Sequence, residues 1–182
     1  LSAVTIDEGI KGYRDEAVRF ADQNCRKLGI EHLMTSFKDL FGVQLDELVN
    51  LLKNKTGSCS EALSPCAYCG VLRRRALNVA ARQAKADKLA LAHNLDDEVQ
   101  TILLNIMHGD ASRIARVKPV LEESHPKFVP RVKPLCEVPE KEIAFCAYLK
   151  KTEFQSMPCP YASTAMRNDI RLMVNRIEEK HP

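Results

Sequence analysis

The sequence contains no tryptophan, and only 5% of its 182 residues are aromatic. No apolar run approaches the roughly 20 residues that cross a bilayer, which excludes a membrane-spanning helix. Seven glycines and nine prolines, beside 45% hydrophobic residues, exclude a collagen-like or disordered chain. An excess of one charge is also lacking, because 27 Lys and Arg against 24 Asp and Glu give a net charge of only +3. The composition predicts one folded domain of ordinary size, with at most a small appendage.

An export signal is lacking as well. Leu1 opens an apolar run without an initiator methionine, a basic segment or a cleavage site, so we expect an ordered portion of a longer chain rather than a secreted precursor. The cysteines are odd in number: Cys25, Cys59, Cys66, Cys69, Cys136, Cys146 and Cys159. Without an export signal, these thiols are expected to stay reduced in the cytoplasm, as core residues, metal ligands or nucleophiles.

Strands and helices are expected to alternate along the chain. Short apolar runs predict strands over residues 1–6, 32–37, 88–92 and 128–135. Apolar residues at helical spacing predict helices over residues 17–28, 45–52, 70–85, 94–107, 139–150 and 163–179. Two prolines interrupt the last strand, so we expect it at a sheet edge. The alternation predicts an α/β domain with a doubly wound, mostly parallel sheet.

Cys66 and Cys69 form a C-x-x-C motif that we expect immediately before the helix beginning at Gly70. There, the helix dipole and the neighbouring Arg73 and Arg74 should lower the thiol pKa and favour the thiolate, which can bind metal. A structural zinc needs four ligands, usually from two such motifs, and the sequence has no second C-x-x-C. From spacing alone, metal binding and a redox dithiol both stay open.

A third ligand would have to come from a distant part of the chain. Cys159 is the best candidate, because a proline on each side holds it in an irregular loop outside any core stripe. Cys25 and Cys146 lie within helical apolar patterns and are expected in the core. Cys59 and Cys136 are ambiguous.

A polar group follows the strand expected over residues 88–92. Asn94 is a good helix cap, and Asp97 three residues later completes a capping box. The same place, beyond the carboxyl end of a strand, suits an acid that holds magnesium on nucleotide phosphates. The two interpretations are compatible.

Two segments concentrate basic residues. Residues 73–88 contain six Lys and Arg against one acid, and residues 113–133 contain six against two. A solvated helix face would explain the first segment. Two basic segments flanking one thiol site also favour a phosphate-rich partner.

Three motifs, in this order, resemble the tRNA 2-thiolation enzymes of the TtcA/TtuA family within the PP-loop ATPase superfamily. They are residues 4–10 with Gly12-Tyr13-Arg14, residues 66–75, and residues 93–98 followed by Gly109-Asp110-Ala111. Each motif is weak alone, but the ordered combination is specific and covers essentially the whole chain. The run Cys-Gly-Val-Leu-Arg-Arg-Arg is most similar to the cytoplasmic branch, which thiolates wobble uridine 34.

The resemblance implies ATP-dependent 2-thiolation of a tRNA uridine. ATP adenylates the C2 oxygen of the base, and a sulfur nucleophile then displaces AMP. Cys66, Cys69 and Cys159 are implied as ligands of a [4Fe-4S] cluster with one open iron, and Cys66 and Cys159 as catalytic residues. Asp97 is implied as the catalytic acid near ATP and Mg²⁺, with His93 beside it.

Further positions follow from the same resemblance. The positions implied for ATP binding are Ile6, Arg73, Ala92, His93 and Asp97. The positions expected to contact tRNA are Arg74, Arg75, Arg113 and Arg116.

The resemblance also predicts the organisation of the chain. It implies an adenine nucleotide alpha hydrolase-like PP-loop domain over residues 1–135 and a C-terminal helical part over residues 136–182 that carries the third cluster cysteine. The phosphate loop, Ser-Gly-Gly-x-Asp-Ser, and the first strand are expected upstream of Leu1, in a longer protein; the alternative is an inactive truncated form. Zinc is expected in terminal C-x-x-C ribbons that this sequence lacks.

The implied partners are tRNA and a sulfur donor, either free sulfide or a ubiquitin-like thiocarboxylate carrier, in the cytoplasm and without a membrane. A homodimer and a heterodimer are both open. Two alternatives remain: thiolation of another tRNA base, uridine 54 or cytidine 32, or a non-catalytic zinc or tRNA-binding module.

Overall fold

The computed structural model describes residues 1–55, 64–115, 117–121, 125 and 127–181. The chain divides into two compact units, which we describe separately. The first unit contains residues 1–84 and 152–162, and the second contains residues 85–151 and 163–182. The expected domain boundary after residue 135 stays a prediction.

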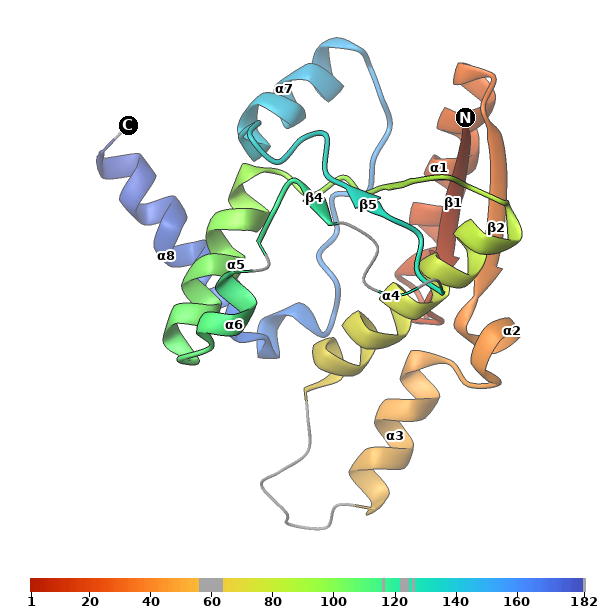
Figure 1. Cartoon of the computed structure of the whole chain (residues 1–182), viewed down its shortest axis with the longest axis horizontal. Coiled ribbons are helices and arrows are strands. Elements are labelled where there is room, and N and C mark those ends of the chain that lie inside the picture. The colour runs from red at the N-terminus through yellow and green to blue at the C-terminus, as the bar shows by residue number, and fades with distance from the viewer. Residues whose placement is uncertain (56–63, 116, 122–124, 126, 182) are drawn as a thin grey trace. The chain divides into compact units, whose positions relative to one another are not determined.

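The first unit is built on two parallel strands joined by a helix (Figure 1). Strands β1 (Ser2–Asp7) and β2 (Glu31–Ser36) pair along their whole length, first residue to first and last to last. Helix α1 (Arg14–Leu28) connects them and packs against both. This β-α-β connection is the one that parallel neighbours require, because a tight hairpin cannot join them.

Three further helices complete the first unit: α2 (Phe37–Phe41), α3 (Leu45–Lys55) and α4 (Pro65–Gln83). A capping box between Ser36 and Asp39 begins α2 directly at the end of β2. Phe37 is thereby fully buried, which contributes about 1.5–3 kcal/mol of hydrophobic stabilisation. α4 packs against β1, β2, α2 and α3.

One hydrophobic cluster forms the core of the first unit, and it includes a cysteine. Its members are Ile6, Ile10, Phe37, Leu45, Val49, Cys69, Ala76 and Ala80. Cys159 and Tyr161, from the segment 152–162, pack against this cluster. The C-x-x-C helix and this distant segment therefore share one core.

Helix α4 begins five residues earlier than the sequence pattern predicts. The side chain of Ser64 accepts a hydrogen bond from the backbone N–H of Ala67, and Pro65 occupies the first turn, where its missing N–H costs nothing. The expectation that Cys66 and Cys69 precede the helix is therefore wrong, because both lie in its first two turns.

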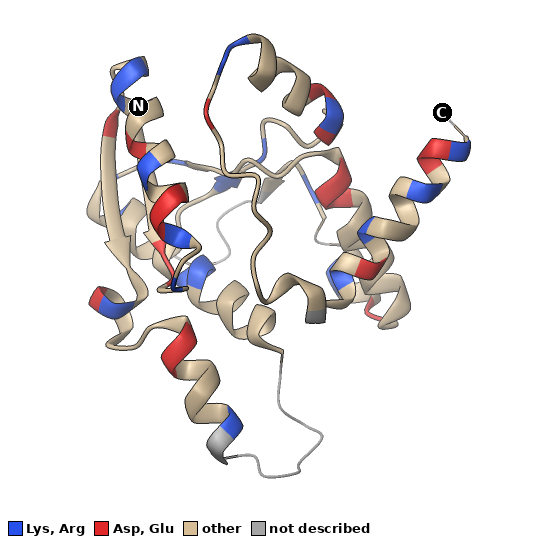
Figure 2. Cartoon of the chain, turned by 180° about the vertical axis from the view of Figure 1, so that it is seen from behind, with Lys and Arg blue, Asp and Glu red and all other residues tan. Residues whose placement is uncertain are grey.

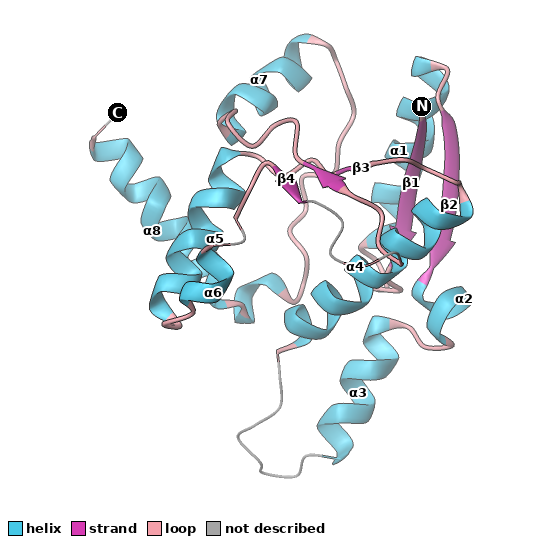
Figure 3. Ribbon diagram, in the orientation of Figure 1, coloured by secondary structure: helices cyan, strands magenta, loops and turns pink. Residues whose placement is uncertain are grey.

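The second unit contains a small mixed sheet in the order β3-β5-β4 (Figure 3). β3 (Leu89–Ala90) and β5 (Arg131–Val132) are parallel, and β4 (Val120–Leu121) is antiparallel to β5. The expected edge position of the last strand is wrong, because β5 is central. Its prolines, Pro130 and Pro134, flank the two paired residues, and the Pro130 carbonyl still accepts the N–H of Leu89 at 2.8 Å.

Helices of the second unit are α5 (Leu95–Met107), α6 (Ala111–Ile114), α7 (Glu140–Leu149) and α8 (Met166–Lys180), and a 3₁₀ turn, η1 (Ala162–Thr164), precedes α8. α5 packs against α8 and α6. Along α5, Ile106 and Met107 are exposed, whereas Gln100 and Asn105 are buried.

The expected α/β class with mostly parallel strand pairs is confirmed. α2, α6 and β4 are short elements that the sequence pattern does not predict. Among the helices that the structure describes, none combines the length and hydropathy needed to cross a bilayer.

Candidate functional site

The loop that follows β1 is fixed by a tight polar turn. Asp7 Oδ1 accepts the backbone N–H of Gly9 at 2.8 Å. Gly9 has a φ of +71°, and a Cβ there would lie 2.6 Å from atoms of Gln44. Only glycine suits this position, both for its φ and for the close approach. The loop is therefore held rigidly at the carboxyl end of the strand.

A buried carboxylate lies in this loop. Glu8 is 2% exposed, and its two oxygens face two arginines. Oε2 pairs with Arg14 Nε at 2.5 Å, and Oε1 pairs with Arg73 Nε at 2.8 Å. Arg14 also donates to the carbonyl of Ile6 at 2.7 Å. The two arginines offset the desolvation cost of burying this carboxylate, which would be strongly destabilising without a charged partner.

One of these two arginines, Arg73, also contacts a cysteine. Arg73 donates through Nη2 to Cys69 Sγ at 3.3 Å, one helical turn earlier on α4. Burial raises the pKa of Cys69, although the charge of Arg73 opposes this. Burial and the neighbouring Cys159 likewise raise the pKa of Cys66. The expectation of lowered thiol pKa values is therefore wrong, because desolvation outweighs the arginine.

The segment 152–162 brings the third cysteine to the first unit, and we call it the strap. Hydrogen bonds that fasten it include Asn24 Nδ2 to the Glu153 carbonyl at 2.8 Å, Gln155 Nε2 to the Tyr13 carbonyl at 2.6 Å, and Tyr161 Oη to Asp46 Oδ1 at 2.7 Å. Cys66 Sγ donates to the Tyr161 carbonyl at 3.4 Å. The strap thereby places Cys159 beside the C-x-x-C helix.

The tyrosine of the strap remains a hydrogen-bond donor at every physiological pH. Burial and the hydrogen bond to Asp46 raise the pKa of Tyr161 to about 12. Asp46 accepts on both oxygens, since its Oδ2 takes the backbone N–H of Lys11 at 3.0 Å. Asp46 therefore joins the strap to the loop after β1.

Three thiols of the first unit form the candidate donor set, and thiolates are the ligands that iron–sulfur clusters use. Cys66, Cys69 and Cys159 are all free and lie in one unit. No three His, Cys, Asp or Glu side chains within the described ranges are close enough to hold one metal ion. A single zinc requires ligands that converge on one point. In a cubane cluster each cysteine binds a different iron, so convergence on one point is not needed.

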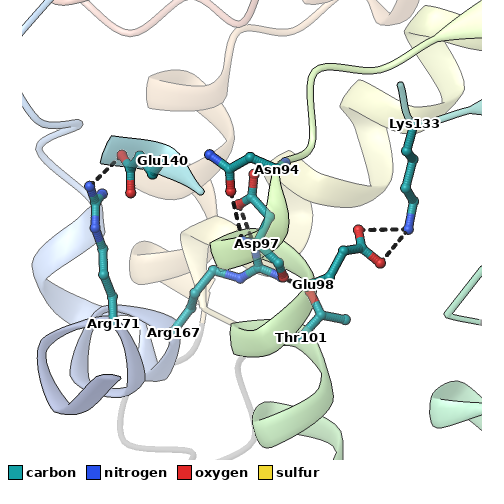
Figure 4. Close-up of polar contacts among 8 residues, drawn as sticks. All are labelled: Asn94, Asp97, Glu98, Thr101, Lys133, Glu140, Arg167 and Arg171. Atoms are coloured by element: carbon teal, nitrogen blue, oxygen red, sulfur yellow. Dashed lines mark hydrogen bonds and ion pairs between the residues drawn. The ribbon is translucent and has the colours of Figure 1, made fainter. Parts of the chain in front are cut away.

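The acid expected near ATP lies in the second unit, at the start of α5. Asn94 and Asp97 form the expected capping box, with Asp97 N–H donating to Asn94 Oδ1 at 2.9 Å. Asp97 Oδ2 accepts the backbone N–H of Asn94 at 3.3 Å, and Asp97 Oδ1 pairs with Arg167 Nη1 of α8 at 3.3 Å (Figure 4). Arg167 also donates to Thr101 Oγ1 at 2.5 Å. The capping interpretation is confirmed, and the catalytic one stays a prediction.

His93 directly precedes this cap. Desolvation lowers its pKa, and Lys133 adds to this, whereas Asp97 opposes it. Lys133 is itself held by both carboxylate oxygens of Glu98 at 2.8 Å (Figure 4). This half-buried pair joins α5 to the residue that follows β5.

The other positions expected to bind ATP differ in exposure. Ile6 is buried in the core of the first unit, where its side chain cannot meet a ligand, although its carbonyl is used by Arg14. Ala92 is exposed after β3. Arg73 is held by Glu8 and Cys69, and its role as a phosphate contact stays a prediction.

The positions expected to bind tRNA are exposed where they are described. Arg74 is exposed on α4, and the guanidinium carbon of Arg75 lies 5.7 Å from the centre of the Phe41 ring. Arg113, in the second unit, pairs with Asp110 at 3.0 Å. Arg116 lies outside the described residues. Along α1 and α8, basic and acidic residues alternate instead of forming blocks of one sign (Figure 2).

The remaining cysteines separate into different environments. Cys25 is buried on α1, which confirms its expected place in the core. Cys146 is exposed on α7, so its expected core position is wrong. Cys136 is partly buried, and Cys59 lies outside the described residues.

Sequence patterns do not identify three residues of these sites. Glu8 carries one usable signal, a carboxylate between the apolar Ile6 and Ile10, which implies a buried charge in need of basic partners. Tyr161 and Arg167 carry no local signal, because their partners Asp46 and Asp97 are distant in the sequence.

Comparisons with known proteins agree with these features. The chain is 40% identical to the tRNA 2-thiolation protein NcsA of Haloferax volcanii, covering 100% of this chain and 56% of that protein. It is 37% identical to the cytoplasmic tRNA 2-thiolation protein 1 of Chlamydomonas reinhardtii, covering 100% and 48%. The U34-tRNA thiolase NcsA from Methanococcus maripaludis, solved with its [4Fe-4S] cluster, matches with a TM-score of 0.82 and 36% identity, covering 100% and 56%.

The chain thus spans about half the length of the curated relatives it matches. A PP-loop domain matches residues 1–178, which is nearly the whole sequence. The α/β fold, the parallel strand pairs and the match over nearly every residue lead to one conclusion: the chain belongs to the PP-loop domain family.

Proposed function

We propose that this chain is the catalytic region of an ATP-dependent tRNA 2-thiolation enzyme that acts on wobble uridine 34. The observation that carries the proposal is the assembly of Cys66, Cys69 and Cys159 in one unit, although the last is 90 residues beyond the second. The relatives named for tRNA 2-thiolation support the substrate class. The neighbour named as a U34-tRNA thiolase supports the base.

The proposed reaction has two steps. In the first, the C2 oxygen of uridine attacks the α-phosphorus of ATP, and pyrophosphate leaves. In the second, a sulfur nucleophile attacks C2, and AMP leaves with the former uridine oxygen. Adenylation is needed because a carbonyl oxygen is a poor leaving group, whereas AMP is a good one.

Asp97 is the proposed acid for the first step. Its carboxylate would hold Mg²⁺ on the phosphates of ATP, since carboxylate oxygens are the ligands that Mg²⁺ prefers. Its partner Arg167 is 40% exposed in its side chain, which leaves the guanidinium accessible to a phosphate. The lowered pKa of His93 favours the neutral imidazole, which can accept a hydrogen bond.

The three thiols are the proposed ligands of a [4Fe-4S] cluster. When bound, the cluster supplies an iron that has no protein ligand and can therefore take the sulfur for transfer. The chain holds the ligands in a partly apolar setting, where Cys69 lies in the core and the strap covers Cys66. Burial of this kind keeps water from competing at the sulfur.

The names of the relatives suggest the compartment and the partners that we propose. The name of the Chlamydomonas protein includes the word cytoplasmic, and we propose the same compartment here. The proposed partners are tRNA and a sulfur donor, either sulfide or a thiocarboxylate carrier.

The cluster ligands are tested on the full-length protein, purified without oxygen. Iron and sulfide per chain, with the visible absorption, should fall to background in Cys66→Ser, Cys69→Ser and Cys159→Ser. Cys146→Ser is the matched control, because that thiol is exposed on α7, and it should retain the cluster. Retention in Cys159→Ser with loss in Cys136→Ser would show that the third ligand is wrong.

The substrate is tested with tRNA transcripts, ATP and sulfide. Mass spectrometry of nuclease digests should find 2-thiouridine from a transcript with U34 and none from its U34-to-C variant. Thiolation of the U34-to-C transcript at position 54 or 32 would favour the other base-modifying branch. A protein that binds tRNA and yields no thiolated base with any transcript would be a binding module instead.

A further inference from the structure

We infer that Glu8 is a positioning residue for the thiol site, acting through Arg73 on Cys69. The inference rests on the proposed cluster for its chemical meaning, but the contact itself lies within the chain. Glu8 Oε1 binds Arg73 Nε at 2.8 Å, and Arg73 Nη2 donates to Cys69 Sγ at 3.3 Å. One guanidinium therefore links a buried carboxylate to a cysteine sulfur.

The carboxylate is the fixed end of this link. Glu8 is 2% exposed, whereas the side chain of Arg73 is 50% exposed. Arg14 forms an ion pair with the other oxygen of Glu8, and it also donates a hydrogen bond to the Ile6 carbonyl. The Glu8 carbonyl also accepts the N–H of Leu45 at 2.8 Å, which fixes the backbone of the same residue. Glu8 is thus held from three sides, and it pairs with an arginine whose side chain is half exposed.

The planar fork of arginine is what this geometry requires. Two donors of one guanidinium point in fixed directions, one to Glu8 and one to Cys69. Lysine carries its donors on one nitrogen at the end of a flexible stem, so it does not offer two separate nitrogens held in fixed directions. Glu8 therefore decides which way the Nη2 donor of Arg73 points.

The consequence concerns the electronic character of the sulfur. Hydrogen bonds to ligand sulfurs are one of the features that set cluster reduction potentials, because they stabilise the more negative, reduced state. Misplacing the Arg73 donor should therefore lower the potential. Removing only the negative charge of Glu8 should raise it. The two effects have opposite signs, which separates positioning from simple electrostatics.

The first experiment needs no cluster. The full-length protein is labelled with ¹⁵N-arginine and freed of iron by chelation, and exchange of the Arg73 Nε–H with solvent is measured by NMR. We expect protection of this proton in the native protein and its loss in Glu8→Gln. Arg82, exposed near the end of α4, is the reference. An Arg73 Nε–H that exchanges as fast as that of Arg82 would overturn the inference.

The second experiment uses the cluster-loaded protein and a double-mutant cycle. The midpoint potential is measured in native protein, Glu8→Gln, Arg73→Lys and the double variant. If Glu8 acts through Arg73, the shift caused by Glu8→Gln differs between the native and the Arg73→Lys background. Strictly additive shifts would mean that the two residues act independently. Arg82→Gln, which removes a charge from the same helix, should leave the potential unchanged.

The outcomes keep this inference apart from the proposed function. A native protein that never acquires a cluster refutes the cluster proposal, while the exchange measurement still decides whether Glu8 holds Arg73. A native protein with a cluster but an unprotected Arg73 Nε–H refutes the positioning role alone. Should Glu8→Gln fail to fold, Arg73 exchange in the native protein and the potential of Arg73→Lys decide the question. An unchanged potential in Arg73→Lys would count against it.

Discussion

At Asp97, a cap, an ion pair and a proposed catalytic contact share one carboxylate. Asp97→Asn keeps an amide oxygen for the N–H of Asn94 and loses a partly exposed pair with Arg167. Exposed pairs contribute little, so we expect a loss of less than about 1 kcal/mol in unfolding free energy. Thiolation in a single turnover should fall by about 100-fold, because the contact to developing charge is removed. Urea unfolding and rapid-quench assays measure the two effects.

The control for Asp97 separates its two roles. Asn94→Ala removes the cap and retains the carboxylate, so it should cost about 0.5–2 kcal/mol of stability with the charge still in place. If Asp97→Asn thiolates at nearly the native rate, Asp97 is a structural residue. The catalytic assignment would then be lost.

What the sequence predicts at single residues depends on how near the partner lies. The capping box of Asn94 and Asp97 spans three residues, and its pattern predicts it correctly. The pair of Glu8 and Arg73 spans 65 positions, and only the fold brings it together. The same distance explains the wrong expectation for the thiols, because the burial that raises the pKa of Cys69 comes from the core around it.

Among the elements, the strap is irregular up to Ala162, where η1 begins, and it depends on side chains for its place. Tyr161→Phe removes the hydrogen bond to Asp46, which we expect to cost about 1 kcal/mol in this partly exposed setting. The looser strap should release iron faster, since it carries Cys159. Iron loss to a chelator over time and thermal unfolding of the full-length protein measure both effects.

Tyr148→Phe is the matched control for the strap. Tyr148 is 76% exposed on α7, so loss of its hydroxyl should change neither quantity. Iron release at the native rate in Tyr161→Phe would mean that the remaining contacts, with Asn24, Lys27, Gln155 and Cys66, hold the strap without Asp46.

Elements were predictable where periodicity is long and less so at their boundaries. The strands β1 and β2 and the helices α1, α5, α7 and α8 follow their apolar patterns closely. α4 begins early because Ser64 caps it and Pro65 suits its first turn. β5 can lie between two strands although prolines flank it. Only two of its residues pair, and the prolines that suggested an edge lie just outside them.

At the scale of the whole molecule, the proposed tRNA contacts should make the affinity for tRNA depend on the salt concentration. Each phosphate contact releases counterions, so Arg74→Ala should reduce the slope of log affinity against log salt by about one. Arg75 already lies over the Phe41 ring, and Arg75→Ala should change the slope less and the stability more. Binding of two different tRNAs to the full-length protein between low and moderate salt measures the slope.

A control for the salt slope comes from another helix of the same unit. Lys53, exposed on α3, carries the same charge outside the two basic segments, and Lys53→Ala should leave the slope unchanged. Equal slopes for native protein and Arg74→Ala would mean that Arg74 belongs to a solvated helix face and does not contact a phosphate.

The strap also sets an order of events on the ribosome. The first unit contains residues 1–84 and then 152–162, so all of residues 85–151 must be synthesised before that unit is complete. At about 5–20 residues per second, Cys159 follows Cys69 by roughly 5–20 seconds. During that interval the nascent chain holds a C-x-x-C helix with its strap missing and its core partly uncovered. Closure of the strap therefore marks the moment at which the three thiols first coexist in a folded unit, and cluster loading would have to wait for it.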